Sequence, residues 1–222
     1  MPAYNVTVTA EFVVVDGGNT GGDESGTGGS TGSSTGTSTG GNTGTEQPAN
    51  EDPLFTDVDE DDWFAEAVKY VVNEGLMNGT SSDKFTPNGA TTRGMIVTIL
   101  YRLAGSPAVE SDGKTWWSDA RVWAMAKGVS DGTNMDREIT REQLATMLYR
   151  YAELMGEDVS KTTSLDSFRD GGKVSAYAVE ALQWAAAEGI VTGKTGSIID
   201  PQAGATRAET ATMLMRFCEL SK

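Results

Sequence analysis

A Thr-Arg pair occurs three times in the 222-residue sequence, and each copy begins the same apolar pattern. The arginines are Arg93, Arg141 and Arg207. Counting from each of them, apolar residues return at the third, sixth, seventh and tenth positions, with Thr210 as the one polar exception. This spacing is the apolar stripe of an amphipathic helix. A stripe written three times predicts a repeat protein, because no unit can bury its stripe alone and the units have to pack on one another.

A second helical pattern precedes each arginine helix and ends at a glycine suited to a helix C-terminus. These patterns cover residues 63–75, 116–128 and 177–189. A short apolar step then leads to a further glycine, which is Gly79, Gly132 or Gly193. The predicted unit is therefore a helix, a loop punctuated by glycines, and a second helix. The middle unit differs, since 9 positions separate its second glycine from the arginine, against 14 in the other two units.

Composition limits the classes of function that the chain can serve. The net charge of -15 leaves no basic footprint of the kind that nucleic acid requires, so nucleic acid is not an expected partner. The absence of histidine removes the usual general base and most zinc sites. The sequence contains neither a secretory signal nor an apolar run long enough for membrane insertion. A role at the cell surface would then require this chain to be the tail of a longer exported protein.

The N-terminal part of the sequence differs from the repeats. Residues 4–15 alternate between apolar and polar side chains, which predicts one β-strand. A lone strand is not stable in water, so we expect it to belong to an upstream exported domain or to self-associate with a neighbouring molecule. A Gly, Ser and Thr-rich stretch follows and predicts a flexible, disordered linker. The predicted organisation is a terminal strand, a linker and three repeats, at 1–16, 17–52, 53–106, 107–157 and 158–222.

Several motifs taken together resemble a known family. They are FTDV at 55–58, DDWFAEAV at 61–68, the FTP loop at 85–87 and the three Thr-Arg helix starts. The repeats resemble three tandem S-layer homology motifs, by which many bacterial surface proteins attach to the cell wall. The resemblance implies an all-α domain of three helix-loop-helix repeats around a pseudo-threefold axis, non-catalytic and without a cofactor. It further implies that secondary cell wall polysaccharide, often bearing pyruvate ketals, binds in grooves between repeats at the bacterial cell surface.

The arginines fit that implied role. An arginine in the first turn lies near the positive end of the helix dipole, which is unfavourable by about 0.3 to 1 kcal/mol. A ligand carboxylate would remove the misfit by meeting both the guanidinium and the first-turn N–H groups. We expect Arg207 to be the best anchor, since Thr206 and Glu209 form a capping box, and Arg141 the weakest, since its unit has the short loop. A second arginine follows nine positions after each, as Arg102, Arg150 and Arg216.

Aromatic residues and glycines complete the candidate site. Aromatic rings stack on the apolar faces of sugars, although the same positions suit the packed stripe of the first helix. The register leaves Trp116 and Trp117 as alternatives in the middle unit, and Tyr177 takes the position in the third. The loop glycines would let the backbone approach a ligand, although turns with positive φ explain them better. The aromatic and glycine candidates are Trp63, Trp117, Trp184, Gly79, Gly132 and Gly193.

Three other functions remain open from the sequence. Asp57, Asp59 and Asp61 match the start of a calcium-binding loop, but the glycine and the final glutamate that such a loop needs are missing. A lattice-forming helical module is favoured if the three arginines pair with internal carboxylates. A glycosidase would require two acids about 5 to 10 Å apart across one cleft, and no repeated acid accompanies a pocket motif.

Overall fold

The computed structural model describes residues 55–220, and this part of the chain consists of helices and loops. The α-helices are α1 (Ala65–Asn73), α2 (Arg93–Leu103), α3 (Ser118–Ala126), α4 (Arg141–Met155), α5 (Val179–Ala187) and α6 (Arg207–Glu219). Short 3-10 turns are η1 (Leu165–Ser167), η2 (Gly171–Lys173) and η3 (Ala176–Ala178). The predicted all-α class is confirmed for these residues. None of their helices is long and apolar enough to cross a membrane. The predicted strand and linker lie outside the described residues.

Each arginine helix begins where the Thr-Arg pair predicts. The N-caps are threonines, and each hydroxyl accepts a hydrogen bond from the N–H of the third helical residue. Helices α4 and α6 have complete capping boxes, with Gln143 and Glu209 in the third position. Helix α2 has Met95 there, so it lacks the reciprocal side-chain bond. The capping box predicted for Thr206 and Glu209 is confirmed.

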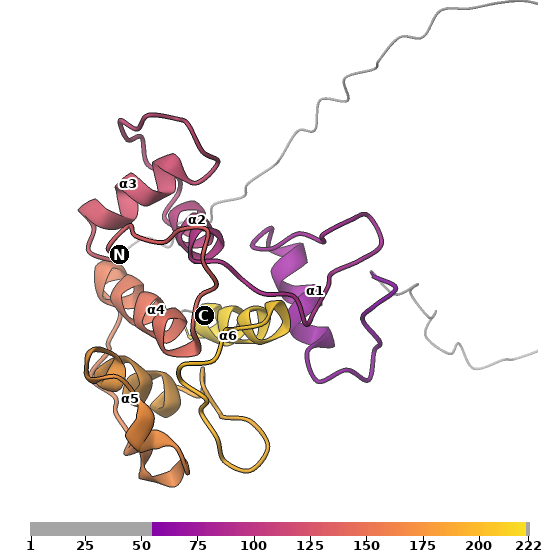
Figure 1. Ribbon diagram of the computed structural model, residues 1–222, viewed down its shortest axis with the longest axis vertical. Coiled ribbons are helices and arrows are strands. Elements are labelled where there is room, and N and C mark those ends of the chain that lie inside the picture. The colour runs from indigo at the N-terminus through magenta and orange to yellow at the C-terminus, as the bar shows by residue number, and fades with distance from the viewer. Residues whose placement is uncertain (1–54, 221–222) are drawn as a thin grey trace, which may run out of the picture. The chain divides into compact units, whose positions relative to one another are not determined.

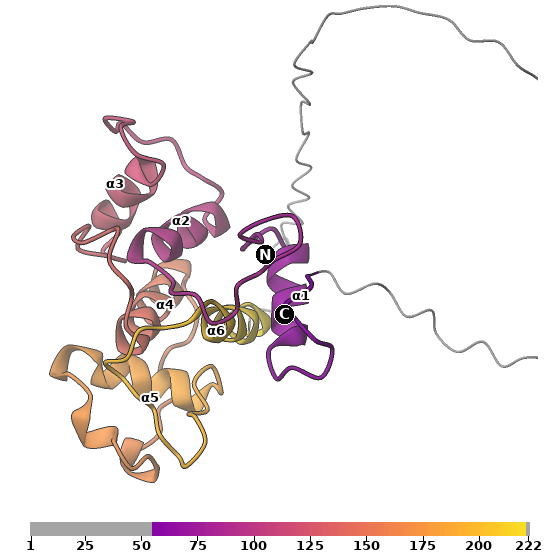
Figure 2. The same ribbon diagram turned by 45° about the vertical axis from the view of Figure 1, so that its right-hand side comes forward.

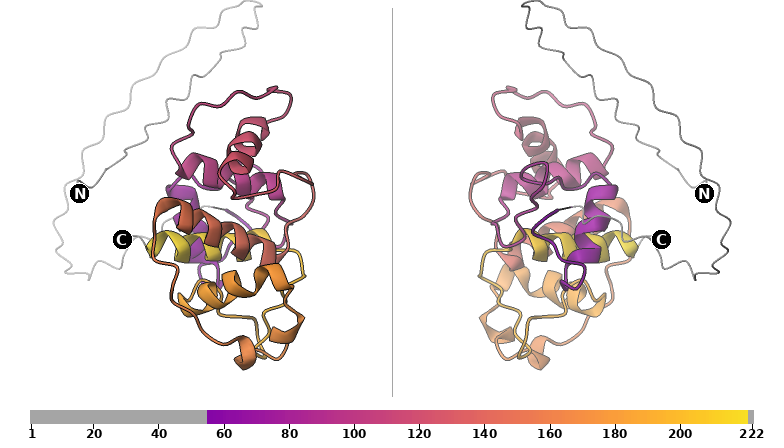
Figure 3. Two further views of the ribbon diagram at one scale, coloured as in Figure 1. Left: turned by 90° about the vertical axis from the view of Figure 1, so that its left-hand side faces the viewer. Right: turned by 90° about the vertical axis from the view of Figure 1, so that its right-hand side faces the viewer.

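The six α-helices pack as three pairs that do not coincide with the predicted repeats. Helix α2 packs on α3, α4 on α5, and α1 on α6 (Figures 1 and 2). Two of the pairs join the end of one repeat to the start of the next. The third pair brings the first and last helices of the described region together, as the violet α1 and yellow α6 show in Figure 3. The repeats are units of sequence, whereas these pairs are the units of packing.

A closed ring of hydrogen bonds joins the segments that precede the three arginine helices. The N–H of Thr91 donates to the carbonyl of Ala205 at 3.1 Å, Ala205 donates to Ile139 at 2.9 Å, and Ile139 donates to Thr91 at 2.9 Å. All three residues are at most 1% exposed. Because buried backbone groups require partners, each segment depends on the other two. The ring therefore fixes where α2, α4 and α6 begin relative to one another.

Two aspartates hold the long loops of the first and third repeats. The carboxylate of Asp57 accepts hydrogen bonds from the N–H of Thr86 at 2.9 Å and of the residue before it at 2.8 Å. Asp170 binds Asp200 and the residue before it in the same way, with both distances 2.8 Å. Thr86 and Asp200 have φ angles of 57° and 54°, a left-handed conformation that costs a non-glycine residue about 1 to 2 kcal/mol. The FTDV and FRD motifs therefore stabilise these turns.

The middle repeat makes the same turn without an aspartate clamp. Thr86 and Asp200 lie seven positions before their arginines, and Asn134 lies seven positions before Arg141. Its φ angle is 53°, close to the other two. Asparagine adopts the left-handed region several times more often than most non-glycine residues. The asparagine side chain thus explains how this shorter loop keeps the turn after losing the leading motif.

A line of aromatic rings crosses the core and links the helix pairs. Tyr101 lies 5.7 Å from Trp123 between ring centroids, Trp123 6.3 Å from Tyr151, Tyr151 6.0 Å from Phe217, and Phe217 6.3 Å from Trp184. Each such contact contributes about 0.5 to 1.5 kcal/mol beyond the area it buries. Trp184 is only 1% exposed, so it has no face available to a sugar. The predicted glycan-binding role of Trp184 is wrong, and its place in the packed stripe is the correct alternative.

The aspartate clamps predict a specific pH dependence of stability. Burial raises the pKa of Asp57 and of Asp170, but the backbone N–H donors and a nearby lysine together lower it by more, so both pKa values lie below the ordinary value. The unfolded chain then binds more protons in this range. The stabilisation is complete above about pH 4 and is lost as the pH falls through the folded-state pKa values.

We expect Asp170→Asn to lower the free energy of unfolding at pH 7 by about 1 to 3 kcal/mol, because an amide offers only one acceptor oxygen to two N–H groups. The double variant Asp57→Asn, Asp170→Asn should also lose less stability than the parent between neutral and acidic pH. Urea unfolding followed by circular dichroism measures both effects. Asp61→Asn, at an exposed position, is the control. An unchanged pH profile in the double variant would contradict the assignment.

Candidate functional site

Two grooves open between the helix pairs, and both contain an arginine from a Thr-Arg pair. The Arg141 groove has a volume of about 430 Å³ and is lined by Trp63, Arg141, residues 190–195, Glu209, Thr212, Met213 and Arg216. The Arg93 groove has a volume of about 340 Å³ and is lined by Arg93, Ser130, Asp131, Gln143, Thr146, Met147, Arg150 and Tyr177.

The two grooves are built from equivalent positions. Helix α4 lines the Arg93 groove with the residues two, five, six and nine positions after Arg141, and α6 lines the Arg141 groove with the corresponding residues after Arg207. The arginine that names each groove comes from the preceding arginine helix. An aromatic residue completes each groove, Tyr177 in one and Trp63 in the other. Each groove therefore takes residues from all three repeats, so it exists only in the assembled domain.

In the Arg93 groove the guanidinium of Arg93 is bound to the loop of the next repeat. Its Nε donates to the carbonyl of Thr133 at 3.0 Å, and Nη2 lies 2.6 Å from Oδ1 of Asp131. The Arg93 side chain is 10% exposed and that of Asp131 is 64% exposed. Burial raises the pKa of Asp131, but hydrogen bonds from Thr133 and the charge of Arg93 lower it by more. The pKa of Asp131 therefore lies below its ordinary value.

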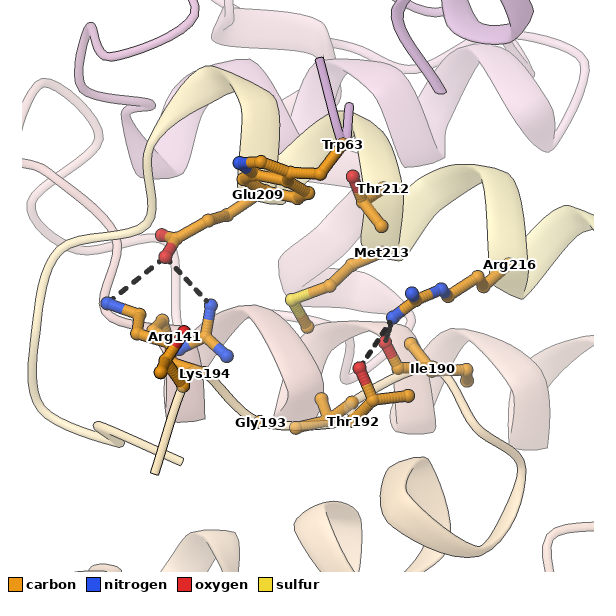
Figure 4. Close-up of a pocket in the computed structure, with 12 residues that line it drawn as sticks. Trp63, Arg141, Ile190, Thr192, Gly193, Lys194, Glu209, Thr212, Met213 and Arg216 are labelled. Atoms are coloured by element: carbon orange, nitrogen blue, oxygen red, sulfur yellow. Dashed lines mark hydrogen bonds and ion pairs between the residues drawn. The ribbon is translucent and has the colours of Figure 1, made fainter. Parts of the chain in front are cut away.

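In the Arg141 groove one carboxylate lies between two cations (Figure 4). Oε1 of Glu209 is 3.3 Å from Nη1 of Arg141 and 3.1 Å from Nζ of Lys194. Its other oxygen, Oε2, accepts the N–H of Thr206 at 3.0 Å, and Nε of Arg141 donates to the carbonyl of Ile199 at 2.7 Å. Burial raises the pKa of Glu209, but Thr206, Arg141 and Lys194 together lower it below the ordinary value. Glu209 is therefore ionised at neutral pH.

A further cation lies at the opposite end of the Arg141 groove. Figure 4 shows Arg141 and Lys194 on one side of Met213 and Arg216 on the other. Arg216 lies seven positions after Glu209 along α6, a rise of about 10 Å. Nη1 of Arg216 donates to Oγ1 of Thr192 at 3.2 Å. Arg150 takes the equivalent place in the Arg93 groove. The arginine that recurs nine positions after each Thr-Arg arginine was therefore the sequence signal that could have identified Arg150 and Arg216 as groove residues.

Arg207 has a different environment from the one that its capping box suggested. Its Nε donates to the carbonyl of Phe85 at 2.8 Å, and Nη2 donates to the carbonyl of Asn78 at 2.5 Å. The guanidinium carbon lies 4.4 Å from the centroid of the Phe85 ring. Burial lowers the pKa of Arg207, and the charge of Asp57 opposes that effect. Arg207 lines neither the Arg93 groove nor the Arg141 groove, and it ties the third repeat to the first.

The first-turn N–H groups of the arginine helices do not face a ligand. In α6, the N–H of Arg207 donates to the carbonyl of Gly89 at 2.8 Å and that of Ala208 to Pro87 at 2.9 Å. The first two N–H groups of α2 and of α4 are bound in the same way by the loops before α4 and α6. The predicted use of these donors by a ligand carboxylate is therefore wrong. Neighbouring backbone carbonyls already satisfy them, which leaves only the side chains for an anion.

The structure settles the register of the exposed aromatic residues. Trp63, Trp116 and Tyr177 each lie one position before the N-cap of α1, α3 or α5. Their exposed fractions are 66%, 61% and 53%. Trp117 is itself the N-cap of α3, and its Nε1 donates to Asp136 at 3.0 Å. Trp116, rather than the predicted Trp117, is therefore the equivalent of Trp63.

The loop glycines are required by the backbone. Gly132 and Gly193 have φ angles of 69° and 80°, which favour glycine, as predicted for these turns. Gly79 is different, because a Cβ atom there would lie 2.5 Å from the carbonyl oxygen of Ser81. Gly193 is the one of the three that also lines a described groove.

Of the functions left open by the sequence, the calcium loop and the glycosidase gain no support from the metal-ligating side chains of residues 55–220 or from the two grooves. These residues contain no group of three or more His, Cys, Asp or Glu side chains placed to hold a metal ion. Asp57, the first position of the calcium-loop alternative, binds the backbone of Thr86 and its neighbour instead. Each described groove is lined by one acidic residue, Asp131 or Glu209, so neither contains the carboxylate pair of a glycosidase.

The sequence matches the S-layer homology domain at residues 54–94 and 167–211. It is 25% identical over 181 residues to an amylopullulanase of Thermoanaerobacterium thermosulfurigenes, a match covering 77% of this chain and 10% of that protein. It is 24% identical over 178 residues to an S-layer protein of Bacillus thuringiensis subsp. finitimus, covering 73% of this chain and 21% of that protein. The chain therefore spans only a small part of the length of these relatives.

Among solved structures, the undecaheme cytochrome from the S-layer of Carboxydothermus ferrireducens is similar to 69% of this chain and 20% of its own chain, with a TM-score of 0.40 and 20% sequence identity. The matched segments of the family contain the aspartate clamps and the Thr-Arg starts of α2 and α6. The two matched segments are S-layer homology domain matches, and together with the S-layer relatives they support a cell-wall anchoring module at the cell surface.

Proposed function

We propose that residues 55–220 bind an acidic cell wall polysaccharide, with pyruvylated secondary cell wall polysaccharide as the favoured ligand, through Arg93 and Arg141 in their two grooves. The observation that carries the proposal is the charge of those grooves. Among the lining residues, the Arg141 groove has three cations and one carboxylate, with Asp200 also pairing with Lys194 at 3.0 Å, and the Arg93 groove has two cations and one carboxylate. Both lie in a chain whose net charge is -15. Local attraction governs the binding because charges more than about 8 to 10 Å away are screened by salt.

The shape of the grooves also suits a sugar. Each has an exposed aromatic ring close to a guanidinium, so the ring offers an apolar face while the arginine offers charged donors. Thr146 and Met147 in one groove, and Thr212 and Met213 in the other, line the surface between the cations. A strand of polysaccharide lying along α4 or α6 would meet a cation at each end of that surface.

We further propose that the three repeats surround a pseudo-threefold axis that passes through the ring of Thr91, Ile139 and Ala205. The support is that each of these residues donates to one partner and accepts from the other. The Nε atom of each Thr-Arg arginine also donates to a backbone carbonyl of another repeat. Equivalent contacts made in a closed cycle are what a threefold arrangement would produce.

A second function has an observation in its favour. Arg93 and Arg141 each pair with an internal carboxylate, which is the feature expected of a lattice-forming or purely structural module. Both arginines also line open grooves, whereas a structural role alone does not require a groove. Retention on polysaccharide by arginine variants separates the two functions.

We expect Arg93→Ala and Arg141→Ala each to weaken retention on purified cell wall polysaccharide by about tenfold or more, which corresponds to about 1.4 kcal/mol per tenfold. Retention of the parent chain should decrease as salt is added, because an ionic contact is screened. Polysaccharide from which the pyruvate groups have been removed should retain the parent chain more weakly. Co-sedimentation at several salt concentrations measures all three effects.

Arg137→Ala is the matched control for these variants. It removes the same charge from an exposed position that lines neither groove. Unfolding curves should accompany each binding measurement, because Arg93 and Arg141 also bond to neighbouring loops. Retention of a folded Arg93→Ala, Arg141→Ala double variant at the parent level would refute the proposal and favour the lattice-forming function.

Arg207→Ala should act on stability. It removes charge-assisted hydrogen bonds to the carbonyls of Phe85 and Asn78 that hold the third repeat against the first. We expect the free energy of unfolding to fall by at least about 2 kcal/mol, with Arg207→Lys only partly restoring it because lysine lacks the guanidinium fork. Urea denaturation measures the change. A stable Arg207→Ala variant that has lost polysaccharide binding would instead place Arg207 in the ligand site.

Trp63→Ala should weaken polysaccharide binding without unfolding the domain. The ring is 66% exposed and lines the Arg141 groove, so its removal affects a sugar more than the core. We expect a loss of about three- to tenfold in affinity and little change in the unfolding midpoint. Trp116→Ala is the control, since that ring is similarly exposed but lines neither described groove. Equal losses for both variants would argue against a specific role of Trp63.

A further inference from the structure

The two grooves differ in charge at one equivalent position. The third residue of the floor helix is Gln143 in the Arg93 groove and Glu209 in the Arg141 groove. Both side chains complete a capping box, Gln143 accepting from the N–H of Thr140 at 3.3 Å and Glu209 from that of Thr206 at 3.0 Å. Capping therefore does not require a charge at this position. The negative charge of Glu209 has to be explained by what else it contacts.

Glu209 pairs with Arg141 and shares Lys194 with Asp200, whose Oδ2 lies 3.0 Å from Nζ of Lys194. One of its oxygens contacts both Arg141 and Lys194, and the Glu209 side chain is only 12% exposed. Lys194 has no cationic counterpart in the other repeats, where a threonine follows the second loop glycine. The strongest cluster of positive charge in the described grooves is therefore the one with a shielded internal carboxylate.

The counter-ion of Arg93 is held differently. Asp131 belongs to the facing loop and its side chain is 64% exposed, so water screens the pair and competes for it. The contacts of Glu209 are largely shielded from solvent. Attraction between opposite charges is stronger in such a shielded environment than in water. A ligand carboxylate can displace Asp131 from Arg93, because the exposed Asp131 side chain can rotate into the solvent. Glu209 is bound by three partners and is largely buried, so it is harder to displace.

We propose that Glu209 is an internal counter-ion with which an acidic sugar must compete for Arg141 and Lys194, and that uncharged Gln143 leaves the Arg93 groove the tighter site for a ligand carboxylate. This inference rests on the proposed glycan-binding function and deepens it. Like charges close together oppose binding, and Glu209 does not relieve the repulsion by taking up a proton at neutral pH. The third residue of each floor helix thus sets the preference of its groove for acidic ligands.

The test uses the full chain and a methyl glycoside carrying one pyruvate ketal, with calorimetry as the readout. In an Arg93→Ala background, which leaves the Arg141 groove, Glu209→Gln should tighten binding by about tenfold. In an Arg141→Ala background, which leaves the Arg93 groove, Gln143→Glu should weaken binding by a similar factor. Both changes keep the capping box, so each variant should fold, and unfolding curves give the stability lost with the Glu209 ion pairs.

Two controls and a substitute background make the result specific. The uncharged methyl ester of the same probe should bind equally with and without the Glu209→Gln change, because the competition concerns charge. Glu66→Gln removes a carboxylate from an exposed site on α1 and should leave the affinity unchanged. If Arg93→Ala does not fold, Arg150→Ala, at an exposed side chain that lines the same groove, replaces it as the background.

The outcomes separate this inference from the function on which it rests. If the parent chain does not bind the acidic probe, or the arginine variants bind it as the parent does, the proposed function fails and the inference falls with it. If binding depends on the arginines but Glu209→Gln leaves it unchanged or weaker, only the inference is overturned, and Glu209 is then a residue that positions Arg141 and Lys194. Tighter binding by Glu209→Gln together with weaker binding by Gln143→Glu supports it.

Discussion

The hydrogen-bond ring formed by Thr91, Ile139 and Ala205 is the constraint on which the rest of the domain depends. It brings three segments that are far apart in sequence into one buried contact, and each segment leads directly into an arginine helix. The carbonyls beside the ring then bind the first N–H groups of the neighbouring helices. Since these donors are satisfied by other repeats, helix starts and repeat packing form together. The grooves are a consequence, because each arginine has to reach across to a loop of another repeat.

The same arrangement explains how an acidic chain forms cationic grooves. Arginine in a first turn is opposed by the helix dipole, but here neighbouring carbonyls and carboxylates compensate it before any ligand arrives. Asp131 and Glu209 pair with Arg93 and Arg141. Under the proposed function, the same ion pairs would both position the arginines and compete with a ligand for them. The balance between them depends on how far each carboxylate is shielded from water.

Much of the local structure could be predicted from the sequence, and less of the site. The N-caps at Thr140 and Thr206 and the helix starts followed from residues within four positions of each other. The different environments of Arg141, which lines a groove, and Arg207, which bonds to carbonyls of the first repeat, did not follow, because a capping box and a loop length do not specify which residues a guanidinium meets. Trp184 was assigned to a sugar because its spacing fits either a stripe or a stacking ring, and only packing distinguishes the two. Lys194 gave no repeated signal at all, since its equivalents are threonines.

The sequence by itself determined the repeat, the ends of the helices, the class of fold and the likeness to S-layer homology motifs. These depend on periodicity and on contacts between neighbouring residues. The tertiary structure alone decided which helices pair, which arginines face a groove and which carboxylates oppose them. The physical reason is the distance along the chain, since Arg141 bonds to a carbonyl 58 residues away and Arg207 to one 129 residues away. A motif specifies that an arginine begins a helix, but the partner that its guanidinium meets is set by how the repeats close on one another.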